Sequence, residues 1–376
     1  MARLIVSGGG TGGHIYPALA IADGVMQRWP GTDILYVGAR AGMESRIVEE
    51  TGYPFRGISA EGWQGRKATT LVAALRADAK GTREAMGLFA AFRPDAVVGT
   101  GGFVCLPVGL AAARKRIPLF LHEQNAMPGL TNRLVSIRAK RVMVSFEEAV
   151  GRFPAVSRKK TAVTGLPVRA SITAADRGDA LAYFQLNHGK KTILVAGGSQ
   201  GAQRINRAML HVMGKLYQRQ GVQILFATGH RDYRQMAEEL AGVGMEWEIA
   251  AGGKSNIRMF PYIDRMDLAY AAAQIFVGRA GASTLAEITL SKLPAILVPY
   301  PQATENHQTF NAASLMDRGG ALLLEDETLT GPVLLAALEG LLADEGRRAA
   351  MAACSGQASY ARALEDILDI LTEVMV

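Results

Sequence analysis

The sequence predicts an α/β fold made of two similar halves, each with a parallel sheet that helices cover on both faces. Short, almost wholly apolar segments alternate with longer segments of helical periodicity, which is typical of strands buried on both faces. An apolar strand, a glycine-rich turn and a helix open the chain, and the same design returns at residue 190. The 376 residues suffice for two domains with separate cores.

The first half begins with the apolar stretch RLIVSGG, which breaks into glycine and then into a segment with helical spacing. The alternation continues from there. We expect strands at 3–9, 33–38, 94–102 and 118–125, and helices at 14–29, 43–52, 69–92 and 106–116. Gly81 is a candidate break in the third of these helices, because glycine weakens a helix interior.

The second half repeats the plan after the segment TAVTGLPVR. A strand, a glycine loop and a helix cover 190–210, and further strands are expected within 222–229, 257–263, 274–281 and 294–301. The repeat predicts two Rossmann-like domains, 1–164 and 165–356, joined near Gly165–Arg169 and facing a deep cleft. The stretch 357–376 has helical apolar spacing and can pack back on the first domain, but its sequence does not place it.

Composition limits the location and the partners. Cys105 and Cys354 give neither metal spacing nor a disulfide framework, which favours a reducing compartment. We expect no signal peptide, and no window approaches the roughly 20 apolar residues of a spanning helix. Up to Pro167 there are 22 Lys and Arg against 12 Asp and Glu, and after it 19 against 22. The basic first half is expected to attract an anionic partner such as a lipid surface or a phosphate, unless it is only a solvated surface.

Three glycine-rich loops each follow an apolar strand and precede a helix: Gly8–His14, Gly99–Phe103 and Gly197–Gly201. Glycine lets the backbone turn tightly and present N–H groups to an anion at a helix N-terminus. The alternative is tight packing of strand on helix without any ligand. Three such loops at the same edge of two sheets favour binding.

Gly8, Gly10 and Gly13 have the spacing of a dinucleotide fingerprint. That fingerprint also needs an acidic residue at the end of the second strand, to hold a ribose. Asp33 instead begins that strand, which ends near Arg40. An NAD site is therefore disfavoured.

The second half offers a better nucleotide site in GRAGASTLAEI. Small residues at a turn from strand to helix let the backbone amides near Ala282–Thr284 cap a diphosphate. Glu287, one turn into the helix, is placed to accept hydrogen bonds from ribose hydroxyls, although it can equally be an ordinary first-turn glutamate. Gln308 and Asn311 stand one turn apart if their segment is helical, and such amides suit sugar hydroxyls.

Seven segments stand in order between Arg3 and Asn311: GGGTGGHIYPALAIA, GTGGFVCLPVGLAA, HEQNAMPGLTNRL, VTGLPVR, GGSQGAQRIN, GRAGASTLAEI and PQATENHQTFNA. Together they resemble the MurG family of bacterial N-acetylglucosaminyltransferases. The resemblance implies a GT-B fold and inverting, metal-independent transfer of GlcNAc from UDP-GlcNAc to the C4 hydroxyl of undecaprenyl-diphosphate-MurNAc-pentapeptide (lipid I). The product is lipid II, the precursor of peptidoglycan.

The resemblance further implies that no cofactor takes part and that the protein is peripheral to the cytoplasmic face of the cell membrane. Cell-wall synthesis and division proteins are then candidate partners. By motif matching, the UDP-GlcNAc site comprises Thr11, Gly12, Gly13, Asn125, Arg169, Ser199, Ile263, Ala282, Ser283, Thr284, Leu285, Ala286, Glu287 and Gln308. Glu287 would hold the ribose, and Ile263 would lie against the uracil. The acceptor diphosphate would meet loops at Gly10, Thr100, Gly101 and Gly102.

Inverting transfer needs a base for the attacking hydroxyl and stabilisation of the departing UDP. His14 is the first candidate base, because it begins a helix beside the acceptor loop, and Glu123 in HEQN is the second. The alternative for His14 is a structural role in orienting the loop or binding the sugar. Arg169 and backbone amides are expected to stabilise the leaving diphosphate.

One segment of the first half suits contact with anionic lipid. Its apolar residues Leu71, Val72, Leu75, Met86, Leu88, Phe89 and Phe92 stand among Arg66, Lys67, Arg76, Lys80 and Arg83. An ordinary amphipathic core helix explains the same pattern.

Three other functions compete with this one. A non-hydrolysing UDP-GlcNAc 2-epimerase shares the expected fold and donor but needs no lipid acceptor. A transferase that glycosylates a diacylglycerol lipid differs only in its acceptor. A nucleic-acid-binding protein is disfavoured, because no basic stripe is interleaved with aromatic residues, which make up 7% of the chain.

Overall fold

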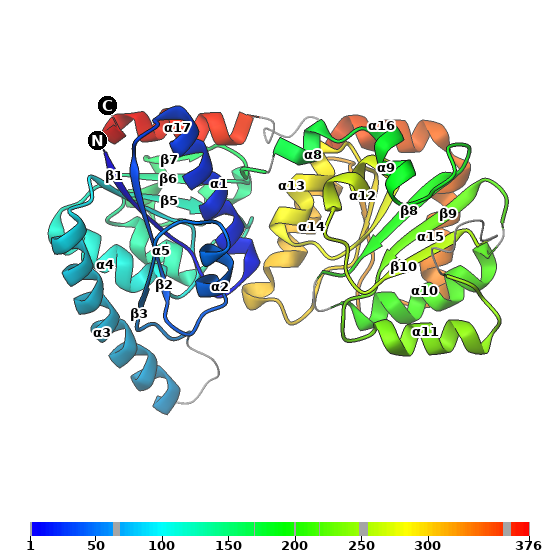
Figure 1. Cartoon of the computed structure of the whole chain (residues 1–376), viewed down its shortest axis with the longest axis horizontal. Helices are drawn as coiled ribbons and strands as arrows, with labels where there is room; N and C mark the ends of the chain where they lie inside the picture. The colour runs from blue at the N-terminus through cyan, green and yellow to red at the C-terminus, as the bar shows by residue number, and fades with distance from the viewer. Residues whose placement is uncertain are drawn as a thin grey trace. The chain divides into compact units, whose positions relative to one another are not determined.

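Two compact units make up the chain in the computed structural model (Figure 1). The first combines Met1–Val168 with Ser359–Val376, and the second is Arg169–Ala358. The structure describes residues 2–62, 68–168, 170–198, 201–217, 219–247, 255–355 and 362–375, without the side chains of 68–73, 170 and 304. Each unit holds one parallel sheet with helices around it, which confirms the predicted α/β class.

The first unit is built on a seven-stranded parallel sheet in the order β3-β2-β1-β4-β5-β6-β7. Its strands are β1 (Arg3–Ser7), β2 (Asp33–Ala39), β3 (Phe55–Ile58), β4 (Ala96–Gly99), β5 (Leu119–Glu123), β6 (Arg141–Val144) and β7 (Thr161–Val163). The strand order reverses between β1 and β4. Ligands of parallel α/β sheets bind at such a reversal, beyond the carboxyl ends of the strands.

Helices cover both faces of this sheet. One face carries α1 (Gly12–Arg28), α2 (Glu44–Glu49) and α17 (Ala363–Met375). The other carries α3 (Ala68–Phe92), α4 (Cys105–Lys115), α5 (Leu130–Ser136) and α6 (Glu147–Val150), and the short α7 (Ala155–Arg158) precedes β7. Successive residues of β1 alternate between the two cores: Leu4 and Val6 lie in the first, and Ile5 lies in the second.

The last helix of the chain belongs to the first unit, although the second unit precedes it in sequence (Figure 1). Apolar residues of α17 are buried in the same core cluster as those of α1. Arg28 of α1 binds Asp369 at 2.7 Å, and Arg141 of β6 binds Glu373 at 2.8 Å. The helix α17 therefore completes one of the two cores of the first unit.

The second unit repeats the design with six parallel strands in the order β10-β9-β8-β11-β12-β13. They are β8 (Lys191–Ala196), β9 (Val222–Ala227), β10 (Ile257–Phe260), β11 (Ile275–Gly278), β12 (Ala295–Leu297) and β13 (Ala321–Leu323). Here the order reverses between β8 and β11. The turns after these two strands are the ones in which the sequence analysis places the nucleotide.

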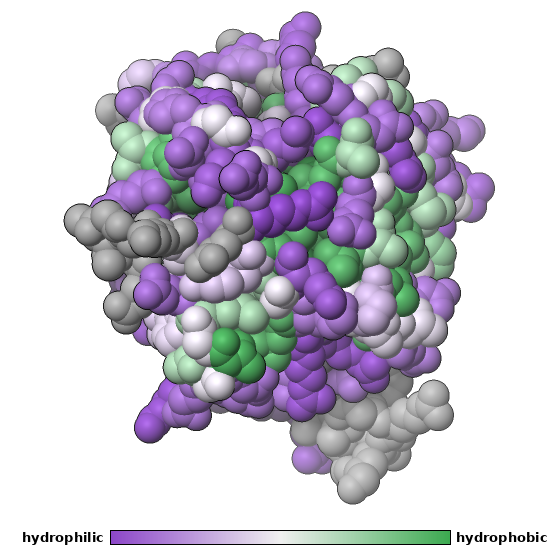
Figure 2. Space-filling view, turned by 90° about the vertical axis from the view of Figure 1, so that its right-hand side faces the viewer, coloured by the Kyte–Doolittle hydropathy of each residue, from purple (hydrophilic) through white to green (hydrophobic). Residues whose placement is uncertain are grey.

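The helices of this unit are α8 (Ala170–Ala174), α9 (Arg177–Tyr183), α10 (Gln203–Leu216), α11 (Tyr233–Gly242), α12 (Met266–Ala272), α13 (Ala282–Leu290), α14 (His307–Asp317), α15 (Gly331–Ala343) and α16 (Glu345–Ser355), with a 3₁₀ turn at Thr304–Asn306. Figure 2 views the chain from the side on which α10, α11 and α15 lie in Figure 1. Hydrophilic side chains dominate that face and hydrophobic ones show in separate areas. Apolar residues of α10, α11 and α15 are buried in one core cluster with those of the sheet.

The structure differs from the sequence-based expectation at Gly81, because α3 runs without a break from Ala68 to Phe92. A Cβ on Gly81 would lie 1.9 Å from the carbonyl oxygen of Ser59. Ser59 follows β3 and is held to α3 by Glu84, whose carboxylate accepts from the Ser59 N–H at 2.6 Å. Glycine stands here because the backbone of another segment packs directly on the helix.

We predict that Gly81→Ala destabilises the protein, whereas Gly87→Ala in the same helix stabilises it. The added methyl at Gly81 displaces the Ser59 segment, which costs about 1–3 kcal/mol in the free energy of unfolding. Gly87 has no atom within 4 Å of its ideal Cβ position. Alanine there gains about 0.5–1 kcal/mol from helix propensity alone.

Urea unfolding of the two variants, followed by circular dichroism, measures both changes. Gly87→Ala controls for the general effect of replacing a helical glycine. Equal stabilisation by the two substitutions would show that Gly81 is not fixed by the contact with Ser59.

Candidate active site

The turns that follow β1 and β4 touch each other at the strand-order reversal of the first unit. The Gly9 N–H donates to the Gly101 carbonyl at 3.3 Å. The Thr100 hydroxyl donates to the carbonyl of His14 at 2.7 Å, so it holds the first turn of α1 against the second loop. The two loops therefore form one structure, with His14 at their contact.

Only glycine permits this contact at two positions of the second loop. Gly101 and Gly102 have φ of +110° and +81°, in the left-handed region. A Cβ on Gly102 would lie 2.1 Å from the Gly9 carbonyl oxygen, and one on Gly101 would lie 2.9 Å from Nδ1 of His14. Tight packing thus explains these two glycines without any ligand.

Packing does not explain Gly13 in the same way. A Cβ there would meet only the Thr11 hydroxyl, at 3.7 Å, and Gly13 is not among the residues with positive φ. The N–H groups of Gly12 and Gly13 begin α1 and have no acceptor among the described residues. They are available to an anion that approaches the backbone closely.

Glu44 fixes the backbone of the loop after β1, a role that was not predicted from the sequence. Its buried carboxylate accepts from the Gly10 N–H at 3.2 Å and from the Ala39 N–H at 2.8 Å. It thereby ties the loop after β1 to the end of β2. A glutamate in the first turn of a short helix is common, so its neighbours in sequence do not reveal this function.

His14 is oriented by two acceptors on one side of its ring. Its Nδ1 lies 3.1 Å from the carbonyl oxygen of Thr100 and 2.9 Å from Oε1 of Gln124. A carbonyl oxygen can only accept, so Nδ1 carries the proton in the neutral ring. Nε2 then has the lone pair and has no partner among the described residues.

Glu123 is buried at the end of β5, and its carboxylate holds the loop that follows. It accepts from the backbone N–H and the side-chain amide of Asn125, from the N–H of Gly129 and from Nδ2 of Asn132, at 2.9–3.2 Å. Four donors surround this carboxylate. The geometry therefore favours a structural role for Glu123 in positioning Asn125.

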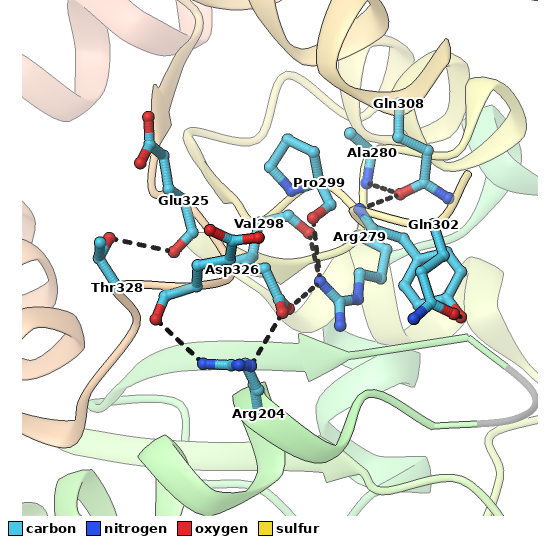
Figure 3. Close-up of polar contacts among 12 residues, drawn as sticks. Arg204, Arg279, Ala280, Val298, Pro299, Gln302, Gln308, Glu325, Asp326 and Thr328 are labelled. Atoms are coloured by element: carbon cyan, nitrogen blue, oxygen red, sulfur yellow. Dashed lines mark hydrogen bonds and ion pairs between the residues drawn. The ribbon is translucent and has the colours of Figure 1, made fainter. Parts of the chain in front are cut away.

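In the second unit, one ion-pair cluster holds the turn after β11 (Figure 3). Arg279 donates to Asp326 at 2.6 Å and to the carbonyls of Val298 and Pro299. Arg204 of α10 also binds Asp326, at 3.1 Å. Because Asp326 and Arg279 are both largely buried, the pair fixes this turn to the segment after β13, and the two carbonyls tie it to the segment after β12.

Gln308 fixes the same turn from α14, so the segment that carries Gln308 and Asn311 is helical. Its Oε1 accepts from the N–H groups of Ala280 and Tyr300, at 3.2 and 3.0 Å (Figure 3). Asn311, one turn on, is buried and donates to the Ala280 carbonyl at 3.3 Å. Both amides thus bind the backbone of the turn.

The helix α13 begins directly after this turn, with Gly281 as its N-cap and no side-chain hydrogen bond capping it. Three of its predicted site residues are buried, Ala282, Leu285 and Ala286, whereas Ser283, Thr284 and Glu287 are partly exposed. The hydroxyl of Tyr270 donates to Oε2 of Glu287 at 2.9 Å and orients that carboxylate.

Of the remaining predicted site residues, the structure describes some and not others. Ile263 is buried in the loop after β10, with 4% of its surface exposed. Arg169 and Ser199 lie outside the described residues, as do Arg66 and Lys67 of the basic segment. Within the ranges given above, no group of three or more His, Cys, Asp or Glu could hold a metal ion.

Comparison with known proteins identifies the family. The model of the Glycosyltransferase family 28 N-terminal domain matches residues 4–144, and that of the family's C-terminal domain matches 192–367. Two relatives bear the name UDP-N-acetylglucosamine–N-acetylmuramyl-(pentapeptide) pyrophosphoryl-undecaprenol N-acetylglucosamine transferase. That of Desulforamulus reducens is 44% identical over 99% of both chains, and that of Desulforudis audaxviator is 46% identical over 99% of this chain and 98% of its own.

A crystal structure of MurG from Acinetobacter baumannii matches 99% of both chains with a TM-score of 0.75 and 29% identity. These matches confirm both the GT-B fold and the resemblance seen in the seven motifs. The chain belongs to glycosyltransferase family 28 and, within it, to the MurG family of N-acetylglucosaminyltransferases.

Proposed function

We propose that the chain transfers GlcNAc from UDP-GlcNAc to the C4 hydroxyl of undecaprenyl-diphosphate-MurNAc-pentapeptide, with His14 as the base. A bond forms between the acceptor O4 and C1 of GlcNAc, while the bond from C1 to the diphosphate breaks. The proton of the hydroxyl passes to Nε2 of His14, and UDP leaves with the electron pair. The configuration at C1 is inverted.

The observation that carries the assignment of His14 is the fixed direction of its ring. Two acceptors face Nδ1, so the nitrogen that bears the lone pair points away from the loops. A base that needs no rearrangement before it takes a proton contributes about 10²–10⁴-fold to the rate. We assign Glu123 a positioning role instead, since four donors already surround its carboxylate.

We assign the nucleotide to the second unit. The first turn of α13 offers backbone N–H groups to the diphosphate, and Arg169 adds a positive charge as UDP departs. Glu287, oriented by Tyr270, is proposed to bind the ribose, and Ile263 the uracil. Gln308 is proposed to act mainly by holding the turn before α13 in place.

The proposal predicts that UDP is released from UDP-GlcNAc only when an acceptor is present. The acceptor is a soluble lipid I analogue with a short prenyl chain, and the readouts are UDP release and the disaccharide product. His14→Ala should lower kcat by at least about 10²-fold. Its affinity for UDP-GlcNAc, measured by calorimetry, should stay close to that of the wild type, because the proposal assigns the nucleotide to residues of the second unit and gives His14 only the proton of the acceptor.

His188→Ala is the matched control, because this exposed histidine lies in the second unit, away from the turns described above. It should leave both kcat and donor affinity unchanged. Conversion of UDP-GlcNAc to its C2 epimer, without acceptor and without net release of UDP, would favour the epimerase. Transfer to diacylglycerol alone would favour the glycolipid transferase. Loss of donor binding in His14→Ala would remove the assignment of His14 as the base.

We also propose that the layer formed by α3, α4 and α5 contacts the anionic cytoplasmic face of the cell membrane. Leu75 of α3 is 58% exposed, Leu134 of α5 is 50% exposed, and Ile137, the C-cap of α5, is 44% exposed. Arg114 of α4 and Arg138, shortly after α5, are also exposed in this layer of helices. Exposed apolar side chains among cations suit an interface with anionic lipid.

Only part of the predicted lipid-binding segment, residues 66–92, is available for this contact. Phe89 is buried in the core of the first unit, and Met86, Leu88 and Phe92 pack against that core. The side chains of Leu71 and Val72 lie outside the described residues. None of the described helices is long and apolar enough to cross a bilayer.

We predict that the double variant Leu134→Gln/Ile137→Gln floats poorly with liposomes that contain anionic lipid. Replacing two apolar side chains that insert into the interface should weaken binding by at least about tenfold. The control is Val243→Gln/Val333→Gln, which removes two exposed apolar residues from the second unit, 65% and 42% exposed. It should float like the wild type.

Addition of salt or removal of the anionic lipid should weaken flotation of the wild-type protein. The placement of the membrane contact fails if both double variants float equally well. It also fails if flotation does not depend on lipid charge.

A further inference from the structure

A line of hydrogen bonds connects His14 with the backbone carbonyl of Gly165. It passes through two buried side chains, Gln124 directly after β5 and His122 within β5. Nδ1 of His14 lies 2.9 Å from Oε1 of Gln124. Nε2 of Gln124 lies 3.0 Å from Nδ1 of His122, and Nε2 of His122 lies 2.9 Å from the Gly165 carbonyl. Gln124 and His122 have 1% and 0% of their surfaces exposed.

Which atom donates and which accepts in each bond of this line follows from the end at Gly165. The Gly165 carbonyl only accepts, so Nε2 of His122 donates to it. Burial lowers the pKa of His122 to about 4, which keeps the ring neutral at pH 7 and leaves a lone pair on Nδ1. Gln124 must therefore turn its amide nitrogen toward His122, where the His122 carbonyl accepts from it as well, at 3.1 Å.

With its nitrogen held in this way, Gln124 presents its oxygen to His14. An oxygen there accepts the proton of Nδ1, in agreement with the Thr100 carbonyl at 3.1 Å on the same nitrogen. If the Gln124 amide were reversed, its N–H would face the N–H of His14 and a lone pair would face a lone pair at His122. The line is consistent in one direction only.

We propose that Gln124 and His122 are positioning residues that hold the proton of His14 on Nδ1 and thereby keep the lone pair on Nε2. His122 does so without touching His14, by fixing the orientation of the Gln124 amide. The proposal rests on the proposed function only in taking His14 as the base, since the tautomer of His14 is a physical property that can be measured without activity.

A purely structural role would not require this arrangement. Apolar side chains at two buried positions would fill the same space and need no hydrogen-bond partners. The chain instead buries the His122 imidazole and the Gln124 amide. From Gly165 to His14, each of their donors faces an acceptor. Such matched networks fix one arrangement of protons among several that differ little in shape.

The first test is Gln124→Met, which keeps the approximate volume but removes both links. The tautomer of His14 is read from ¹⁵N NMR of histidine-labelled protein, with the His14 signals assigned by their absence in His14→Ala. We expect the wild type to show the proton on Nδ1. Gln124→Met should show a larger fraction with the proton on Nε2, because only the longer contact of Nδ1 with the Thr100 carbonyl, at 3.1 Å, remains. The kcat should fall roughly 5–10-fold, with the KM for UDP-GlcNAc unchanged.

Gln223→Met is the matched control. Gln223 is a buried glutamine of β9 that donates to the Asn187 carbonyl and the Thr192 hydroxyl, so it makes a similar number of buried bonds in the second unit. Its replacement should lower stability while leaving the His14 tautomer and kcat as in the wild type.

Two more variants separate the links. Gln124→Glu retains an acceptor for His14 and should retain its Nδ1 proton and most of the turnover. His122→Phe should shift the His14 tautomer although it does not touch that ring, and this shift should vanish in the Gln124→Met background. If His122→Phe does not fold, the comparison of Gln124→Met, Gln124→Glu and Gln223→Met still decides the matter.

The outcomes distinguish this proposal from the proposed function. An unchanged His14 tautomer in Gln124→Met overturns the positioning role and leaves His14 as the base. A changed tautomer with unchanged kcat upholds the positioning role and overturns His14 as the base. A change in both supports the two together.

Discussion

The contact between the turns after β1 and β4 is the constraint on which the rest of the first unit's site depends. The backbones approach so closely that Gly102 has no room for a Cβ beside the Gly9 carbonyl. The same contact sets the Thr100 carbonyl against Nδ1 of His14. Glu44 of α2 ties the first turn to the end of β2, and Gln124 after β5 supplies the second acceptor for His14. The ends of four strands therefore determine the direction of a single imidazole ring.

In the second unit, charged side chains rather than close contacts at glycine fix the turn that precedes the proposed nucleotide site. Its turn after β11 carries Arg279, which Asp326 and two carbonyls hold in the unit's interior. Breaking such a buried pair leaves an uncompensated charge, so the turn is strongly fixed. The amide of Gln308 completes the support by binding two backbone N–H groups. A nucleotide site on α13 would thus rest on a preorganised backbone.

The fold was largely predictable because its signals are local. Continuous apolar runs predicted nine of the thirteen described strands but not β3, β6, β7 and β13, and the glycines marked the turns at both strand-order reversals. The contacts that decide the site are not local. Glu44 reaches residue 10 and Gln124 reaches His14 across more than 30 and 100 positions of sequence, and no periodicity encodes the direction of an amide. The predicted helix break at Gly81 was wrong for the same reason, because glycine is needed there to let the backbone of Ser59 pack against the helix.

The return of α17 to the first unit has a consequence for synthesis on the ribosome. The core that α1 and α17 share stays open until the last residues emerge, because the whole of Arg169–Ala358 is made in between. At about 5–20 residues per second, that interval lasts about 10–40 s. During it, apolar residues of α1 and β1 lack their cover. The nascent first unit is therefore a natural client for a chaperone, whereas the second unit can close its own core while still tethered.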